Sequence, residues 1–206
     1  MTQVFLASRN VKKIEEMRRI LAVSIPDIEV LGLDDVPPYE EPAETGATFE
    51  DNALIKAQAA VAATGMPSLA DDSGLCVDAL NGMPGVLSAR WSGLAKDDLA
   101  NNQLLLAQLA DVPDERRGAR FCCAVAFAYP VGAGGVVEEV THGDMPGRVI
   151  RELRGTRGFG YDVLFVPDGW EVTSAEMESA DKDEISHRGK ALRAMAPIVT
   201  DVLVGL

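Results

Sequence analysis

The sequence predicts an α/β fold, with a long, mixed and twisted central sheet, helices on both of its faces and two lobes around a cleft. Three observations favour this fold. Residues 4–7 form a short apolar segment that leads at once into a helical pattern, which is typical of the opening of an α/β domain. A second helical pattern at 48–65 precedes another apolar segment at 69–77. From residue 119 onward, apolar segments flank a glycine-rich turn, which indicates an antiparallel hairpin and makes the sheet mixed.

The first half of the chain alternates strands with helices. Residues 4–7 are the first expected strand, and a turn at 8–10 leads into a helix at about 11–21. The apolar residues of this helix recur at helical spacing: Ile14, Met17, Ile20 and Leu21. Residues 34–47 are polar and acidic and contain prolines, so we expect a long loop there. Thr48 begins a second helix with Asp51 as its capping-box partner, and Gly65 ends it.

The second half contains the hairpin and the last helix. We expect Asp97 to cap a third helix that extends to about Leu109. Residues 121–129 and 136–142 are the hairpin strands around a turn at 132–135, and residues 148–150 and 163–166 are further strands. The last helix is expected at 186–203, with an inward face formed by Leu192, Met195, Val199 and Val202.

Composition limits the possible classes of function. A length of 206 residues suits a single domain, 1–206. The net charge of -13 argues against general nucleic-acid binding, because phosphate contacts need a basic face. No segment approaches the ~20 apolar residues of a membrane helix, and no signal-peptide pattern is present. The cysteines Cys76, Cys122 and Cys123 lack metal-type spacing, so we expect reduced core residues in a cytoplasmic protein.

The most informative segment is Asp71-Asp72-Ser73-Gly74, which interrupts an apolar run. Burying an unpaired carboxylate is costly, so we expect Asp71 and Asp72 at a strand end, facing a cleft. Paired carboxylates beside a hydroxyl suit Mg²⁺, which takes oxygen ligands and is usually accompanied by phosphate. The alternative is that these aspartates cap a helix or form a side-chain turn at the strand end.

Polar residues around the two early helices form a candidate anion site. Asn10 and Lys13 lie in the first turn of the first helix, where the helix dipole disfavours cations unless an anion is bound. The alternative is an ordinary N-cap beside solvated lysines. Glu44 is either a metal ligand beside Asp72 or part of a solvated acidic loop. Lys56 either reaches phosphate or the carboxylates, or is surface charge.

Two later segments fit a site for a nucleobase. Residues 158–162 place Phe159 between glycines, so that its ring can lie close to a ligand and stack on a base. The alternative is a core phenylalanine in a glycine-rich turn. Lys182 and the pair His187 and Arg188 surround the start of the last helix, and the arginine fork suits carbonyl oxygens or phosphate. A stray surface histidine is the alternative there.

Five motifs in this order make the chain resemble the inosine triphosphate pyrophosphatases. They are residues 6–13, 44–53, 70–75, 158–162 and 185–189, and the match covers nearly the whole chain. One departure is Arg9, where the family usually has glycine. The resemblance implies a two-lobed fold with a nucleotide-binding cleft and a homodimer. It also implies Mg²⁺-dependent hydrolysis of ITP, dITP and XTP to the nucleoside monophosphate and pyrophosphate.

The resemblance further implies a role for each matching residue. Glu44 and Asp72 would hold Mg²⁺, and Asp72, with Asp71 beside it, would activate water, although the sequence leaves open which of the two is the base. Arg188 would donate to the 6-keto oxygen of the base, where adenine carries a donor instead. The phosphates would be bound by Ser8, Asn10, Lys13, Lys56 and Ser73. Phe159 would stack on the base, and Gly160, Tyr161, Asp162, Lys182, His187 and Arg188 would shape its pocket.

Three alternatives to this function remain at the level of sequence. A Maf-type pyrophosphatase for pyrimidine or modified nucleotides also begins with a Leu-Ala-Ser strand end, but Asn10, Lys13 and the segment at 186–189 favour purines. A nucleotide sensor without catalytic activity would not need Glu44, Asp71 and Asp72. A generic α/β domain would explain any one motif as a cap or a turn, but not their joint occurrence.

Overall fold

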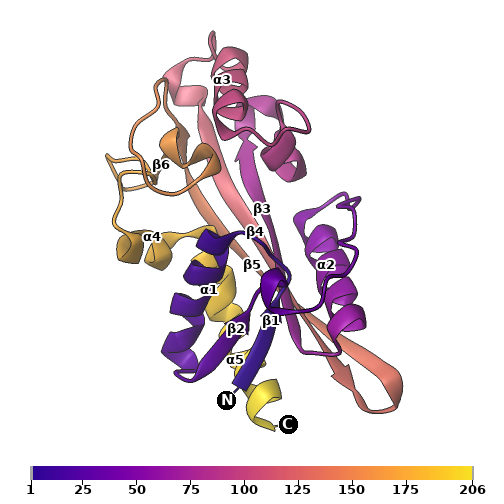
Figure 1. Ribbon diagram of the computed structural model, residues 1–206. Coiled ribbons are helices and arrows are strands. Elements are labelled where there is room, and N and C mark those ends of the chain that lie inside the picture. Colours follow the sequence, from indigo (N-terminus) through magenta and orange to yellow (C-terminus); the bar gives the residue numbers. More distant parts are fainter. Residues whose placement is uncertain (1, 206) are drawn as a thin grey trace. The chain divides into compact units, whose positions relative to one another are not determined.

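A computed structural model describes residues 2–205 and contains one six-stranded sheet in the order β2-β1-β3-β4-β5-β6 (Figure 1). The strand β1 (Thr2–Leu6) is parallel to β2 (Ile28–Leu31) and β3 (Ser68–Val77), whereas β5 (Gly135–Val149) is antiparallel to β6 (Phe165–Pro167). The strand β4 is Gly118–Val131. The predicted mixed sheet is therefore confirmed.

The described chain forms two compact units. Unit 1 contains the residues up to Asp72, the segment Cys123–Gly143 and the residues from Arg188 onward, and unit 2 contains Ser73–Cys122 and Asp144–His187. The strands β3, β4 and β5 each contribute residues to both units. Within the described residues, no helix combines the length and the apolar character that a membrane span requires.

In unit 1, helices cover both faces of the sheet. Successive residues of a strand point to opposite faces, and the two sets of β4 residues pack against different helices. Cys123, Val125 and Phe127 share a buried cluster with α1 (Val11–Ser24) and α5 (His187–Gly205). Ala124, Ala126 and Ala128 share another with α2 (Phe49–Thr64). The small alanines let the α2 helix lie close to the sheet.

Unit 2 has its own apolar core. It is built on β6 and α3 (Asp98–Gln108), and unit 2 also contains the short helix α4 (Ser179–Ile185). The side chain of Arg117 is buried there and donates to the backbone oxygens of Leu109, Val149 and Ile150 at 2.6–3.1 Å. The principal core side chains are those of Leu75, Leu105, Leu109, Phe121, Met145 and Phe165.

The structure confirms the predicted helix caps. Thr48 Oγ1 accepts from the Asp51 backbone N–H at 3.1 Å, and Asp51 Oδ2 accepts from the Thr48 N–H at 3.0 Å. Gly65 follows α2 with φ +70°, a left-handed conformation that suits glycine at this position. Asp97 caps α3 by accepting from the Ala100 N–H at 3.0 Å. The expected inward face of α5 is buried at Leu192, Met195 and Val199, with Val202 partly buried.

Three predictions of local structure are wrong. Asp71 and Asp72 lie in the middle of β3 rather than at a strand end. The strands expected at 136–142 and 148–150 are one strand, β5, because Gly143 and Pro146, which usually interrupt strands, are accommodated within it. Val163 belongs to the 3₁₀ helix η6 (Gly160–Val163), so β6 is shorter than expected. The strand β2 and the helix α4 were not predicted.

Candidate active site

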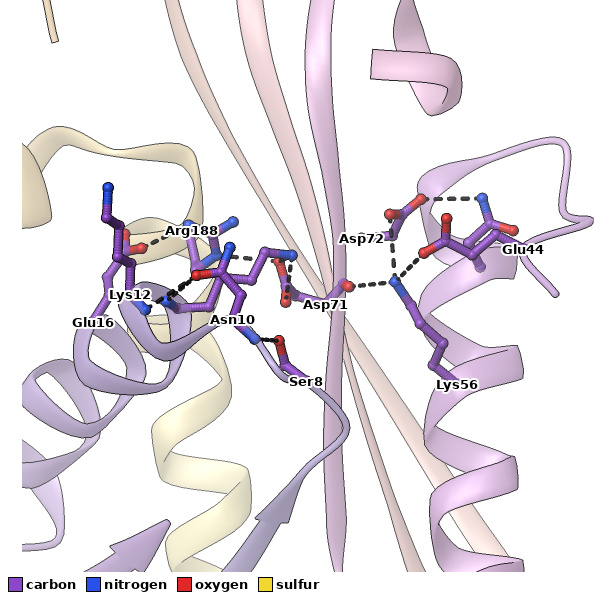
Figure 2. Close-up of polar contacts among 11 residues, drawn as sticks. Ser8, Asn10, Lys12, Glu16, Glu44, Lys56, Asp71, Asp72 and Arg188 are labelled. Atoms are coloured by element: carbon purple, nitrogen blue, oxygen red, sulfur yellow. Dashed lines mark hydrogen bonds and ion pairs between the residues drawn. The ribbon is translucent and has the colours of Figure 1, made fainter. Parts of the chain in front are cut away.

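The two aspartates of β3 face opposite sides of the strand. Adjacent strand residues alternate in direction, and Figure 2 shows Asp71 directed toward Arg188 and Asp72 directed toward Lys56 and Glu44. Both aspartates belong to unit 1, and both are buried. Each must therefore be compensated by its own set of polar partners, because a buried carboxylate without partners is strongly unfavourable.

Asp71 is compensated by two cations. Lys13 Nζ, from the first turn of α1, lies 2.9 and 3.1 Å from its two carboxylate oxygens, and Arg188 Nε lies 3.1 Å from Oδ2. Arg188 Nη1 also donates to Glu16 of α1 at 2.6 Å. Burial alone would raise the pKa of Asp71, but Lys13 and Arg188 together hold it well below its usual range. Asp71 is therefore a fixed negative charge that binds two cationic side chains.

Asp72 has a different environment. Lys56 Nζ, from α2, lies 3.4 Å from its Oδ1 and 2.8 Å from Glu44 Oε1, and it donates to the backbone oxygen of Asp71 at 2.7 Å. Asn52 Nδ2 donates to Asp72 Oδ2 at 3.1 Å. Burial raises the pKa of Asp72 above its usual value, the neighbouring Glu44 raises it further, and Lys56 opposes the shift only in part. A carboxylate with a raised pKa is a stronger proton acceptor than an ordinary aspartate.

The pKa of Lys56 is also shifted. Burial lowers it, but the carboxylates of Asp72, Asp71 and Glu44 outweigh this effect and leave the pKa raised. The side chain is thus a stable cation between two carboxylates. Asn52 and Lys56 lie four residues apart on α2, so both project from the same face of the helix toward β3. The helix places the two side chains together.

The start of α1 is organised by a side-chain cap. Asn10 Oδ1 accepts from the backbone N–H groups of Lys12 and Lys13 at 3.1 and 3.3 Å, and Ser8 Oγ accepts from the Asn10 N–H at 3.1 Å. Asn10 is therefore an N-cap, as one of the two alternatives predicted, but the solvated Lys13 of that alternative is wrong, because its ammonium is paired with Asp71. The cap fixes the first helical turn, from which Lys13 reaches Asp71 (Figure 2 shows the cap at Asn10).

Arg9 connects the same turn to the acidic loop. Its Nε lies 2.9 Å from Glu41 Oε1 and its Nη1 lies 3.2 Å from Asp34 Oδ1. The side chain thus points along the loop at 34–47 that carries Glu44, rather than filling the turn where the family usually has glycine. The exposed ion pairs add little stability by themselves, since such pairs contribute about 0–1 kcal/mol.

The donor set near Asp72 fits a magnesium ion only in part. Among residues 2–205, no group of at least three His, Cys, Asp or Glu side chains is placed to hold a metal. Mg²⁺ in nucleotide enzymes is, however, commonly held by one or two carboxylates together with substrate phosphates and water. Glu44 and Asp72, both held by Lys56 Nζ, match that smaller requirement.

The predicted base-site residues other than Arg188 belong to unit 2. Asp162 Oδ2 accepts from the Phe159 backbone N–H at 2.9 Å and from Lys182 Nζ at 2.6 Å, and Lys182 Nζ lies 5.9 Å from the centre of the Phe159 ring. A side chain at Gly158 would collide with Asp162, and its φ of +74° also favours glycine. The motif at 158–162 is thus tied together by Asp162.

His187 and Tyr161 are also anchored within unit 2. The His187 ring stacks on Phe121, with centroids 4.9 Å apart and planes 12° apart. The Tyr161 hydroxyl donates to the Ser88 backbone oxygen at 2.9 Å and is buried, and burial, with the nearby Asp98 carboxylate, raises its pKa. Ser73, the remaining predicted residue, follows Asp72 on β3 and is the first residue of unit 2.

Sequence reasoning missed several supporting residues. Asn52 and Glu16 hold Asp72 and Arg188 in unit 1. In unit 2, Asp98 Oδ2 accepts from the Gly160 N–H at 2.7 Å, and Asn102 Nδ2 donates to the Gly160 oxygen at 2.9 Å. The helical pattern gave no signal for Glu16, because this residue lies outside the apolar stripe of Ile14, Met17, Ile20 and Leu21, although the structure buries it.

The predicted site residues thus form two groups. Unit 1 brings together Lys13, Glu44, Lys56, Asp71, Asp72 and Arg188, with Ser8 and Asn10 at the adjacent helix start. Unit 2 brings together Phe159, Asp162 and Lys182. Arg188, which was expected in the base pocket, has its guanidinium engaged with Asp71 and Glu16 in unit 1.

Comparison with known proteins gives consistent matches along the chain. Residues 4–198 match the model of the Ham1 family. A protein of Nocardia farcinica named dITP/XTP pyrophosphatase is 61% identical over 96% of this chain and 94% of its own length. A solved structure from Mycobacterium abscessus, described as a nucleoside-triphosphatase / dITP/XTP pyrophosphatase, is 54% identical with a TM-score of 0.74, covering 95% of this chain and 99% of that one. The Ham1 protein of Staphylococcus aureus is 35% identical with a TM-score of 0.84, covering 97% and 99%.

Proposed function

Because this chain belongs to the Ham1 family, we propose that it is a nucleoside-triphosphate pyrophosphatase that converts ITP, dITP and XTP to the nucleoside monophosphate and pyrophosphate. Relatives that are more than half identical over nearly the full chain carry the name dITP/XTP pyrophosphatase. The observation that carries the proposal is the pair of aspartates on β3, because one is a fixed anion between two cations and the other has the raised pKa of a proton acceptor.

The cations of unit 1 bind the triphosphate. Lys13 and Lys56 supply positive charge, and Ser8 and Asn10 supply hydrogen-bonding groups at the start of a helix, where the backbone N–H groups favour an anion. Asp71 holds Lys13 through both of its oxygens and so fixes the ammonium group before substrate arrives. Preorganised positive charge lowers the barrier to attack on phosphorus, because little rearrangement is left for the reaction itself.

Asp72 acts on the attacking water. Its raised pKa and its hydrogen bond from Asn52 suit a carboxylate that accepts a proton while the water attacks the α-phosphate. Glu44 and Asp72 would hold Mg²⁺ together with the substrate phosphates, and a bound Mg²⁺ would neutralise phosphate charge. Lys56 keeps the two carboxylates close to each other and to the backbone of β3.

Unit 2 recognises the base. Phe159 stacks on the purine, while Asp162 and Lys182 fix the motif and present polar groups to the base edges. Gly160, Tyr161, Ser73 and His187 complete the substrate-binding set of unit 2. Contact of Arg188 with the 6-keto oxygen stays a prediction, because the guanidinium is buried in unit 1 and engaged with Asp71 and Glu16. A donor toward this oxygen would reject adenine, which carries an amino group there.

Further proposals concern the compartment, the oligomeric state and the partners of the enzyme. We propose a cytoplasmic homodimer that acts on free nucleotides and binds neither nucleic acid nor membrane. The net charge of -13 supports the exclusion of nucleic acid, because a polyanion would be repelled. Light scattering would test the dimer by comparing the solution mass with twice the mass of the chain.

The decisive experiment is pyrophosphate release from a panel of ITP, dITP, XTP, GTP, ATP and dTTP, with Mg²⁺ and with excess EDTA. We expect fast release from ITP, dITP and XTP, little from ATP, and loss of turnover in EDTA that added Mg²⁺ restores. Preference for dTTP would instead support a Maf-type enzyme. Binding of ITP without turnover would support a sensor.

A further inference from the structure

Two cysteines of unit 2 lie in contact on neighbouring strands. Cys76 Sγ of β3 and Cys122 Sγ of β4 are 3.8 Å apart. Asp78, which directly follows β3, forms an ion pair with Arg120 of β4 at 3.6 Å. Asp78 comes two residues after Cys76, whereas Arg120 comes two residues before Cys122. The two side-chain contacts therefore indicate that the strands run antiparallel here, with Cys76 and Cys122 facing each other.

We propose that Cys76 and Cys122 form a reversible disulfide when the protein is exposed to a peroxide. Residues that face each other across antiparallel strands have Cα atoms about 4.5–5.5 Å apart, which lies within the ~4.4–6.8 Å range of disulfides. Only a small adjustment of the two strands is therefore needed for the bond to form. Formation of this disulfide does not depend on the proposed activity.

The surroundings of the pair favour reactivity. Cys122 is only partly buried, and Cys76 is 9% exposed, so a small oxidant has access from the Cys122 side. Cys122 donates a hydrogen bond to Cys76, and Arg120 lies nearby, so the pKa of Cys76 is lowered despite its burial. The Asp144 carboxylate faces the same group and opposes this effect. Low-pKa cysteines beside a second thiol are the usual sites of reversible oxidation.

The reaction balances with hydrogen peroxide as the oxidant. The Cys76 thiolate attacks one peroxide oxygen, the O–O bond breaks, and the departing hydroxide takes up a proton to become water. Cys122 then attacks the sulfenic sulfur of Cys76, the S–O bond breaks, and a second water leaves after the Cys122 proton is transferred. Two thiols are oxidised to one disulfide, and one peroxide is reduced to two waters.

The bond would be easy to reduce again. Opposed strand residues place their Cβ atoms about 4.5–5.5 Å apart, whereas a relaxed disulfide prefers about 3.5–4.5 Å. The difference strains the bond, and strained disulfides are the labile ones. Thiol reductants should therefore restore both cysteines.

Cys123 provides an internal control. It follows Cys122 on β4 but points to the opposite face, where it is 2% exposed in the core of unit 1. Burial raises its pKa, so it stays a neutral thiol. We expect it to remain unmodified under conditions that oxidise the other two.

The test is thiol counting and peptide mapping of the full-length protein after treatment with hydrogen peroxide. We expect the free thiols to fall from three to one, with a mass lower by two hydrogen atoms, and dithiothreitol to restore all three. Trypsin leaves Cys122 and Cys123 in one peptide, because no Lys or Arg lies between Arg120 and Arg148. Cys123→Ala therefore assigns the crosslink, and it should still lose both of its thiols.

Two variants test the roles of the two cysteines separately. Cys122→Ser should form no intramolecular disulfide and should accumulate a sulfenic acid on Cys76 that dimedone traps, and Cys76→Ser should form neither. A crosslink through Cys123, a crosslink only between molecules, or oxidation to sulfinic acid without any disulfide would overturn the proposal. Fragmentation of the crosslinked tryptic peptide between Cys122 and Cys123 in the mass spectrometer distinguishes these outcomes in the unsubstituted protein, even if a variant fails to fold.

Discussion

At the scale of single residues, Arg188 neutralises two buried carboxylates at once. Its side chain is 3% exposed, and it joins Glu16 of α1 to Asp71 of β3. Removing one member of a buried ion pair costs about 3–5 kcal/mol, because the partner charge stays buried. We expect Arg188→Ala to lower the free energy of unfolding by an amount of this order, measured by denaturant titration.

A test of the proposed role of Arg188 in base recognition requires a more conservative substitution. Arg188→Lys keeps a positive charge near Asp71 and should fold, but it lacks the planar fork of donors. We expect the ratio of kcat/KM for ITP over ATP to fall in this variant. An unchanged ratio in a folded Arg188→Lys enzyme would remove Arg188 from base recognition and leave it with the ion pairs alone.

Asp72 carries the third prediction at this scale. Asp72→Asn can still accept the hydrogen bond from Asn52, but it cannot take a proton from water. General-base catalysis contributes about 10²–10⁴-fold, so we expect kcat for ITP to fall by that factor with little change in unfolding temperature. Asp111→Asn, at an exposed turn residue, is the control and should leave the rate unchanged.

At the scale of elements, α2 depends on a cap that the sequence revealed. Thr48→Ala removes the side-chain acceptor at the start of the helix, and such losses cost about 0.5–2 kcal/mol. We expect a decrease of that size in the free energy of unfolding, measured in urea. Thr48→Ser keeps the hydroxyl and should retain most of the stability. Equal losses in both variants would mean that the cap bond contributes little.

The helix α3 supports the segment 158–162, which we propose binds the base. Asp98 accepts from the backbone N–H of Gly160 and Asn102 donates to its backbone oxygen, next to Phe159. We expect Asp98→Ala to raise KM for ITP more than it lowers kcat, because the stacking residue loses its fixed position. Asp98→Asn retains an acceptor and should recover most of the affinity. Steady-state kinetics of both variants would distinguish this role from general destabilisation, which would affect both variants through the amount of folded enzyme.

Some features of the helices and strands could be predicted from the sequence, and others could not. The capping box at Thr48 and Asp51 and the cap at Asp97 were predictable, because they are local patterns within four residues. The position of Asp71 and Asp72 within β3 was not, because it depends on Lys13, Lys56 and Arg188, which come from other segments of the chain. The strand β2 and the helix α4 are too short for periodicity to reveal them.

At the scale of the whole molecule, ligand binding should be visible as added stability. A ligand that binds only the folded state stabilises it by about 2.7 kcal/mol at a concentration 100 times its Kd. We expect an ITP analogue that cannot be hydrolysed between the α- and β-phosphates to stabilise the unsubstituted protein by that amount in Mg²⁺, measured by thermal denaturation, and to stabilise it less in EDTA. The analogue stays intact during the scan, and both proposed metal ligands, Glu44 and Asp72, remain in place. Equal shifts with and without Mg²⁺ would argue against joint binding of metal and phosphate.

The ion pairs of Arg188 also have a consequence for the order of events during synthesis. The ribosome makes Glu16 and Asp71 before Arg188, which follows them in the chain by 172 and 117 residues and pairs with both. Until Arg188 emerges, Glu16 has yet to gain this cation, and Asp71 has only its pair with Lys13. Unit 1 therefore completes its fold only after the residues of unit 2, through His187, have been made.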